Sequence, residues 1–356
     1  MPPSGMQASN VDATGEHLPY KIRLKEDTHL QLDFFLTTWI LMGMRWLYEN
    51  VTAESVFWTI LISTIVIRGL TVFGDIQSRK SSMKMQMIQP DLDRLKRKYG
   101  NDAQKFQQAQ SKLMREKGVS MWGGCLPMLM MMPLFFCFIA AFRFWGYEQM
   151  VKVLLQMHET GHSELFQNFN FLWVHNIWQP DNGMKEVVMG AKEFLAIPNL
   201  QNLIYFQEHP EALKVFQQLG FIIADPKNIP QASIDTYNNL VAPLVAQYQS
   251  VYNGWFIWPL LAGGTTFLSS WIMQKNQPKP VTADNGQPSA ASQAQSTNKM
   301  MLYLMPAMSV FFCLTSNTAF AIYWTISNVV STFTNMLVNR KFAKELAESK
   351  SEEGNS

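Results

Sequence analysis

Arg68 is the residue of this 356-residue chain whose type and position point most directly to chemistry. It lies inside the otherwise uncharged run Val56–Gly74, VFWTILISTIVIRGLTVFG. A charged side chain at a bilayer centre costs at least about 2.5–3.5 kcal/mol, so it marks a functional site by default. The alternative is snorkelling, in which the guanidinium reaches the polar interface near Gly74. The sequence favours a role for Arg68 in lining a polar groove.

His158, Glu159 and His162 match a second chemical pattern, the H-E-x-x-H motif. On a helix this spacing places two imidazoles on one face for zinc, and the glutamate acts as the general base of a metalloprotease. Gly161 weakens this interpretation, because glycine destabilises a helix by about 1 kcal/mol relative to alanine. We therefore favour an ordinary polar loop and expect no metal site.

Five apolar runs supply the elements that would position these residues. Each holds about 17–22 residues, against the roughly 20 that a 30 Å hydrocarbon layer requires. The last two runs are joined by Asn317 and Thr318, so they should form a tight antiparallel pair. The sequence therefore predicts an all-α, polytopic membrane protein with a core of five transmembrane helices. The predicted spans are Val56–Gly74 and residues 126–147, 255–273, 300–316 and 319–338.

Basic residues set the predicted orientation of these spans. Lysine and arginine far outnumber acidic residues in the segment 78–122, which the positive-inside rule places in the cytoplasm. Alternation then places residues 148–254 outside and both the linker 274–299 and the tail 339–356 inside. The outer segment agrees, because it carries more acidic than basic residues. We predict a multi-pass protein of a bacterial plasma membrane, with its N-terminus outside and its C-terminus in the cytoplasm.

The N-terminal region is predicted to lie outside the core. Residues 1–31 are polar and lack the successive regions of a signal peptide. Residues 32–50 are apolar but form a short segment. On a helical wheel Asp33 and Arg45 fall toward one side, which favours an amphipathic helix in the outer interface over a sixth span.

Composition predicts the character of the remaining segments. The linker 274–299 is rich in Pro, Gln, Ser and Ala, so we expect it to be flexible, and we expect residues 345–356 to be disordered. The outer segment has helix-like stretches at residues 185–196 and 210–220, but its sequence indicates no known fold.

The basic inner segment is predicted to form a helical hairpin. Its first helix covers residues 82–99 with a kink or restart at Pro90, and Asn101 or Asp102 caps the second, which ends at Gly118. Two interpretations stay open: a solvated hairpin that enforces topology, or a docking surface for ribosomes and nascent chains. The docking candidates are Met83, Lys84, Met85, Arg94, Lys96, Arg97, Lys98, Lys105, Lys112 and Arg115.

Polar side chains on the third and fifth predicted spans could offer hydrogen bonds to a polar chain that crosses the membrane. Each unsatisfied polar group in hydrocarbon costs several kcal/mol, so such partners would lower the barrier to crossing. Hydroxyls of this kind also hold helices together, and for the individual hydroxyls packing is the favoured role. The candidates are Thr265, Thr266, Ser269, Ser270, Ser327, Asn328 and Ser331.

Four stretches of the chain, in this order, resemble one known family. They are IRGLTVF, the basic stretch SRKSSMKMQMIQPDLDRLKRKYG with the later span entry GGCLPMLMMMPLFF, then TNKMMLYLMPAMSVFF, and finally AIYWTISNVVS. Their motifs, order and predicted topology resemble the YidC/Oxa/Alb membrane protein insertases. The overall length resembles the short type found in Gram-positive bacteria, although the segment 148–254 is unusually long for that type.

The resemblance implies a fold and a mechanism. Five core helices would enclose a hydrophilic groove open to the cytoplasm and the lipid. Arg68 matches the groove arginine that receives polar parts of a client, the membrane protein that is being inserted. Tyr323 and Trp324 match a pair on the fifth core helix. The hairpin would receive clients.

The resemblance also implies the partners of this chain. They would be nascent membrane proteins, the ribosome and membrane lipids, with the Sec translocon as a further candidate. The protein would be an insertase and chaperone, not an enzyme, and would use no cofactor, metal or nucleic-acid substrate. The alternative from another functional class is a channel or transporter that uses Arg68 as an anion site.

Overall fold

The computed structural model describes residues 35–99, 102–118, 122–275 and 290–353. The predicted N-terminal tail and most of the predicted linker lie outside these residues. Apart from two isolated β-bridges, the described residues form only helices, turns and loops, which confirms the all-α class. The long helices are α1 (Phe35–Asn50), α2 (Val56–Met87), α5 (Trp122–Thr160), α11 (Ile257–Lys275), α12 (Ala290–Thr315) and α13 (Thr318–Glu353).

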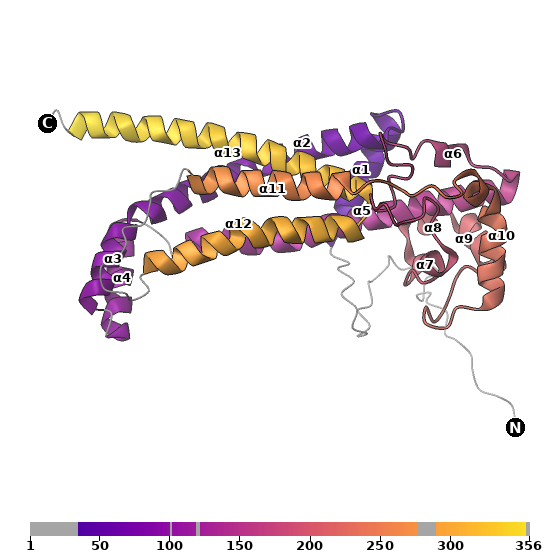
Figure 1. Cartoon of the computed structure of the whole chain (residues 1–356), viewed down its shortest axis with the longest axis horizontal. Helices are drawn as coiled ribbons and strands as arrows, with labels where there is room; N and C mark the ends of the chain where they lie inside the picture. Colours follow the sequence, from indigo (N-terminus) through magenta and orange to yellow (C-terminus); the bar gives the residue numbers. More distant parts are fainter. Residues whose placement is uncertain (1–34, 100–101, 119–121, 276–289, 354–356) are drawn as a thin grey trace, which may run out of the picture. The chain divides into compact units, whose positions relative to one another are not determined.

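Within the compact unit that they form, these helices lie side by side (Figure 1). α11 packs against α12 and α13, and α13 also packs against α2 and α5. α1 lies on α5 and α2. Aromatic rings fill the contact between α5 and α13, where Phe138 stacks on Tyr323 with ring centroids 4.6 Å apart. This packing fixes α2 beside α13, which positions Arg68.

One predicted span is matched by a helix that is long and apolar enough to cross a membrane. Among the described residues this is Val56–Gly74 of α2, while Leu302–Thr315 of α12 is a shorter apolar helix. Large apolar side chains are exposed on the long helices, including Phe73, Leu260 and Phe333. Exposed apolar surface of this kind often marks contact with a membrane or a partner. The count of five spans stays a prediction.

Several helices extend beyond the predicted boundaries. α5 continues to Thr160, so the outer segment begins on a helix. α13 continues to Glu353, so the predicted disorder of residues 345–356 is wrong as far as that residue. The extension is rich in Ala, Leu, Glu and Lys, which favour helix without tertiary contacts. α12 begins at Ala290, so the end of the predicted flexible linker is helical as well.

The predicted hairpin forms from α3 (Gln89–Tyr99) and α4 (Ala103–Glu116), which pack against each other. The predicted restart at Pro90 is confirmed, because α3 begins one residue before it. Of the two predicted caps of α4, Asp102 is the one observed, and its side chain accepts the backbone N–H of Lys105 at 3.0 Å. The hairpin therefore follows the local signals in the sequence.

The outer segment is a small helical domain with an aromatic core. Phe194, Phe216 and Tyr237 are fully buried there. The predicted helix over residues 210–220 is confirmed, whereas only the last part of the predicted helix 185–196 is helical. Its elements are α6 (Glu164–Gln167), α7 (Ala191–Leu195), η1 (Leu200–Asn202), α8 (Ile204–Glu208), α9 (Pro210–Gln218) and α10 (Gln231–Gln247).

Tertiary hydrogen bonds explain why residues 185–190 are not helical. The Lys185 carbonyl accepts the backbone N–H of Asn253 at 2.8 Å. The Val187 carbonyl accepts from Nδ2 of Asn176, and the Met189 carbonyl from the hydroxyl of Tyr237, both at 2.8 Å. These long-range bonds occupy carbonyls that a helix would need.

Asp181 connects the outer segment to the start of α11. Its carboxylate is completely buried and accepts the backbone N–H groups of Trp255, Phe256 and Trp258 at 2.6, 3.0 and 2.7 Å. It also accepts the indole N–H of Trp173 at 3.1 Å. The first N–H groups of a helix have no partner within the helix, and this side chain satisfies that of Trp258 together with the two N–H groups just before α11.

A partly buried cluster of ionisable side chains connects α1, α5 and α8. Nε of Arg45 lies 3.6 Å from Oε2 of Glu148, and the guanidinium also pairs with Glu208. Oε1 of Glu148 accepts the backbone N–H of Tyr205 at 3.2 Å. Burial raises the pKa of Glu148 to about 7, although Arg45, the Tyr205 N–H and Lys152 all lower it.

This pKa predicts a pH-dependent stability. Between about pH 4.5 and about pH 7 the Glu148 carboxyl is protonated in the folded state and ionised in the unfolded state. Because the folded state binds the additional proton, the free energy of unfolding should fall as the pH rises through this window. The shift corresponds to about 3 kcal/mol at most. Glu148→Gln should flatten the slope in thermal unfolding of the detergent-solubilised protein, whereas Glu211→Gln, at an exposed carboxylate, should keep it. Equal slopes for the wild type and Glu148→Gln would contradict the assignment.

Candidate functional site

Arg68 bridges two of the long helices. It is half-buried on α2, and its Nε donates to Oγ of Ser327 at 2.8 Å while Nη2 donates to the same oxygen. Ser327 is fully buried on α13. The structure therefore brings together two predicted groove residues that are far apart in the sequence.

A row of polar side chains continues from Ser327 along α13. Ser331 and Asn335 follow at steps of four residues, which places all three toward one side of the helix. Nδ2 of Asn335 lies 3.5 Å from Oγ of Ser331, and both side chains are half-buried. We call Arg68, Ser327, Ser331 and Asn335 the polar strip. Its groups offer a positive charge and hydrogen-bonding groups at the contact between α2 and α13.

A second polar cluster joins α11, α12 and α13. Nδ2 of Asn328 donates to Oγ1 of Thr266 at 2.8 Å, and that hydroxyl donates to Oγ of Ser309 at 3.1 Å. Ser309 also accepts the indole N–H of Trp324 at 3.1 Å. Thr266 and Trp324 thus both bond to Ser309, which the sequence interpretation missed, and Asn328 joins the cluster through Thr266. The signal for Ser309 was a hydroxyl within the apolar stretch Leu302–Thr315. The bonds run between helices, as the packing interpretation predicts.

The other predicted groove residues lie near these two clusters. Thr265 is half-buried, and its hydroxyl donates to the Leu261 carbonyl at 2.8 Å. Ser269 and Ser270 are half-buried one turn further along α11. Tyr323 is buried in the aromatic contact between α5 and α13.

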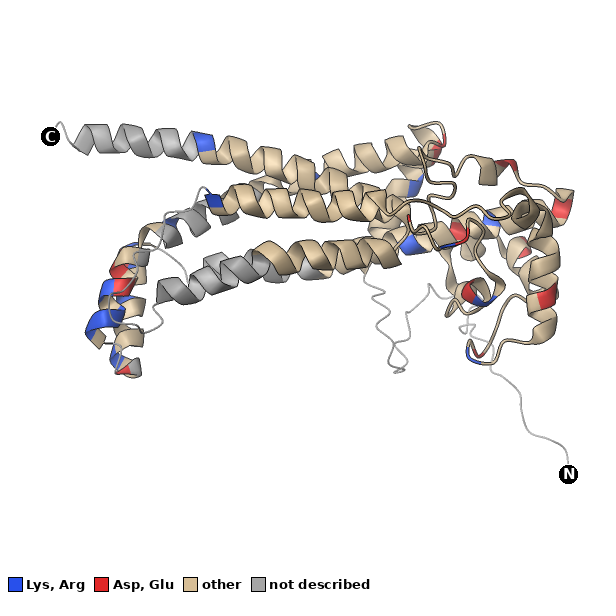
Figure 2. Ribbon diagram, viewed as in Figure 1, with Lys and Arg blue, Asp and Glu red and all other residues tan. Residues whose placement is uncertain are grey.

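The hairpin presents a strongly charged surface. Figure 2 shows lysine and arginine gathered on α3 and α4, whereas acidic residues are spread over the outer segment. The side chains of Arg94, Lys105 and Lys112 are 70–81% exposed, each within 4.0 Å of an acidic residue of the same helix or its cap. Of the other docking candidates, Lys84, Arg97, Lys98 and Arg115 are exposed, Lys96 is half-buried, and the side chains of Met83 and Met85 lie outside the described part.

The H-E-x-x-H pattern does not lie on one helix. α5 ends at Thr160, and Gly161 has φ of 75°. Nδ1 of His162 lies 3.2 Å from the Thr160 carbonyl, so this ring is not one helical turn beyond His158. Within the described ranges no group of three or more His, Cys, Asp or Glu side chains could hold a metal ion.

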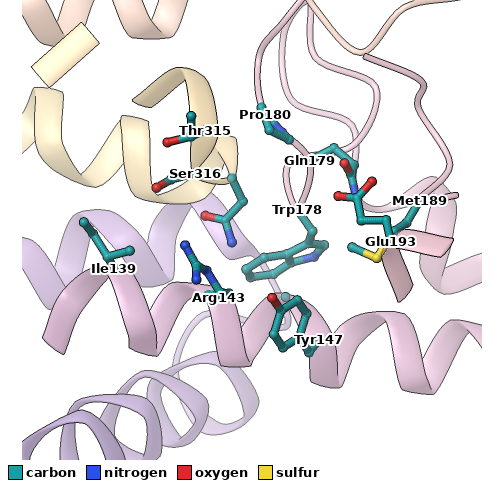
Figure 3. A pocket seen from close by; sticks show the side chains of 12 residues that line it. Ile139, Arg143, Tyr147, Trp178, Gln179, Pro180, Met189, Glu193, Thr315 and Ser316 are labelled. Carbon is teal, nitrogen blue, oxygen red and sulfur yellow. The ribbon is translucent and has the colours of Figure 1, made fainter. Parts of the chain in front are cut away.

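Arg143 is a charged residue of a predicted span that the sequence interpretation overlooked. It lines a cavity between α5, the outer segment and the turn from α12 to α13 (Figure 3). Trp178 and Gln179 also line this cavity, and each has a buried polar atom, Nε1 and Oε1 respectively, without a hydrogen-bond partner among the described residues. An arginine within an apolar run was the available signal.

The sequence matches one family model and several named relatives. The family model described as 60Kd inner membrane protein matches residues 46–345. The membrane protein insertase YidC of Clostridium perfringens is 35% identical over 123 residues, which cover 35% of this chain and 44% of the relative. The protein of the same name from Shewanella sp. (strain ANA-3) is 30% identical over 179 residues, which cover 48% of this chain and 29% of that relative. The matches thus span less than half of each relative's length.

Proposed function

The chain belongs to the 60Kd inner membrane protein family, the YidC/Oxa/Alb insertases, and from this premise we propose that it inserts nascent membrane proteins and assists their folding. The observation that carries the proposal is the polar strip, in which Arg68 is held against α13 beside the hydroxyl and amide groups that follow Ser327. Insertion changes no covalent bond, so the mechanism needs binding and solvation only.

The proposed mechanism lowers the cost of moving a polar tail across the membrane. Each unsatisfied polar group of the tail costs several kcal/mol in hydrocarbon. The strip replaces part of the lost hydration with hydrogen bonds. Arg68 attracts acidic side chains of the tail, and its charge acts more strongly there than in water because the surrounding dielectric is low.

The proposal includes the predicted topology in a bacterial plasma membrane. Five spans cross the bilayer, the basic hairpin and the C-terminus lie in the cytoplasm, and the acidic outer segment lies outside. α1 lies in the outer interface, with its exposed side chains Phe35, Trp39, Met42 and Trp46 in the lipid. The hairpin receives nascent chains and ribosomes, and the Sec translocon is a further partner.

Site-specific photocrosslinking tests this function. A photoreactive residue at Thr71 or Ser331, next to Arg68 or within the polar strip, should crosslink to stalled nascent membrane proteins. The same residue at Lys214, on α9 of the outer segment, should not crosslink. If no crosslinks form at either strip position and purified protein instead conducts anions across liposomes, a channel that uses Arg68 becomes the better explanation.

A further inference from the structure

The cavity of Figure 3 has the composition of a binding site. It is formed by α5, which contributes Arg143 and Tyr147, by Trp178 and Gln179 of the outer segment, and by the turn that follows α12. Its volume is about 80 Å³. A single water needs roughly 10–15 Å³ of such space, so the cavity has room for several waters or one small polar group.

Two buried side chains in its wall need partners of opposite kinds. Trp178 is 3% exposed and Gln179 is 1% exposed, and the unpartnered atoms are an indole donor and an amide acceptor. Neither residue turns away easily. The Trp178 ring packs edge-on against Trp145. The backbone carbonyl of Gln179 accepts the backbone N–H and the hydroxyl of Thr318 at 3.0 and 2.7 Å, which fixes the backbone at this residue. A ligand in the cavity should therefore both accept and donate hydrogen bonds.

The charges around the cavity also have opposite signs. Arg143 comes from α5 and Glu193 from α7, and Tyr147 lies within electrostatic range of both. Glu193 additionally pairs with Lys185. An arginine binds phosphate through its planar fork, and a carboxylate binds an ammonium group. This pair of charges favours a ligand that carries both an anionic and a cationic group.

An apolar stripe leads from the cavity along α12. Thr315 lines the cavity, and Phe311, Met308 and Leu304 precede it at steps of four, three and four residues, which places them on one face. All three apolar side chains are exposed. This stripe is suited to an acyl chain that runs from the cavity toward the membrane centre. A free ion or a soluble headgroup has no apolar chain that could contact this stripe.

We propose that this cavity binds the headgroup of an outer-leaflet phospholipid that carries a phosphate and a primary amine. The phosphate lies against Arg143, and the ammonium group lies between Glu193 and Oε1 of Gln179. Nε1 of Trp178 donates to a phosphate or ester oxygen, and an acyl chain covers the stripe on α12. The assignment to the outer leaflet rests on the proposed topology, whereas binding itself does not depend on insertase activity.

Native mass spectrometry of the purified full-length protein tests the proposal. The protein is exchanged into detergent that contains equal amounts of phosphatidylethanolamine and phosphatidylglycerol, and the retained lipid is counted. The wild type should retain one phosphatidylethanolamine molecule with at least fivefold preference. Arg143→Gln should lower retention of both lipids at least fivefold, and Glu193→Gln should abolish the preference while phosphatidylglycerol is still retained. Lys214→Gln, at an exposed position of α9 outside the cavity lining, should behave as the wild type.

The stripe and the lipid source are tested separately. Phe311→Asn should weaken lipid retention without changing the preference, and soluble glycerophosphoethanolamine should bind at least tenfold more weakly than the lipid. Equal retention by the wild type and Arg143→Gln, or no preference in the wild type, would overturn the proposal and leave a water-filled cavity. Equal binding of the soluble headgroup would overturn the lipid assignment. If Arg143→Gln does not fold, Arg143→Lys replaces it, with reduced but selective retention expected.

Discussion

Arg68→Ala is expected to lower the insertion of single-span clients with acidic outer tails by about tenfold, a factor that corresponds to about 1.4 kcal/mol. The variant removes the cation that would attract the tail in a medium of low dielectric. Clients with neutral tails should lose much less. Protease protection of the translocated tail in proteoliposomes, at matched amounts of the protein, measures the effect.

Three further variants separate the charge of Arg68 from its contact with α13. Arg68→Lys keeps the charge and should retain most of the insertion. Ser327→Ala removes the hydrogen-bond acceptor but keeps the cation, so it should also retain most of it. Arg340→Ala removes an equal charge from the C-terminal half of α13 and serves as the matched control. If Ser327→Ala and Arg68→Ala lose insertion equally, Arg68 acts as a helix connector and the proposed groove charge is wrong.

The sequence predicts the helices well where local signals are strong. Val56–Gly74 is a single apolar run, and Asp102 caps α4 as its side chain and position predict. Local propensity also explains an error, because α13 continues to Glu353 through residues that favour helix although they are polar. Composition alone predicted disorder there, since it gives no weight to continuation from an existing helix.

The sequence does not predict which distant side chains meet. Arg68 was an evident candidate, but nothing local indicates that Ser327 would accept its hydrogen bonds. The same holds for Ser309, which joins three helices, and for Glu148, whose pairing with Arg45 depends on how α1 lies on α5. Such contacts follow from packing between elements, which a single sequence does not specify.

Asp181→Ala should be the most destabilising single substitution in the outer segment. The carboxylate accepts three backbone N–H groups near the start of α11 and the indole of Trp173, and all of them would be left without this partner in a buried site. A hydrogen bond to a charged group contributes about 1.5–3 kcal/mol, and each unsatisfied buried donor adds a penalty. We expect a loss of about 3–5 kcal/mol, measured by chemical unfolding in detergent.

Asp181→Asn and an exposed aspartate show whether burial and charge account for this loss. Asparagine keeps the size and one acceptor but presents an NH₂ group to donors on the other side, so it should recover only part of the stability. Asp225 accepts a backbone N–H from Lys227 and a side-chain hydrogen bond from Asn228 in an exposed loop, and Asp225→Ala should cost about 1 kcal/mol or less.

Because Asp181 fixes the entry to α11, its loss should also loosen the contact of Thr266 with Ser309 and Asn328. If Asp181→Ala unfolds no more easily than Asp225→Ala, the outer segment does not hold α11 in place, and the cluster on α11 to α13 must be positioned by the helices alone.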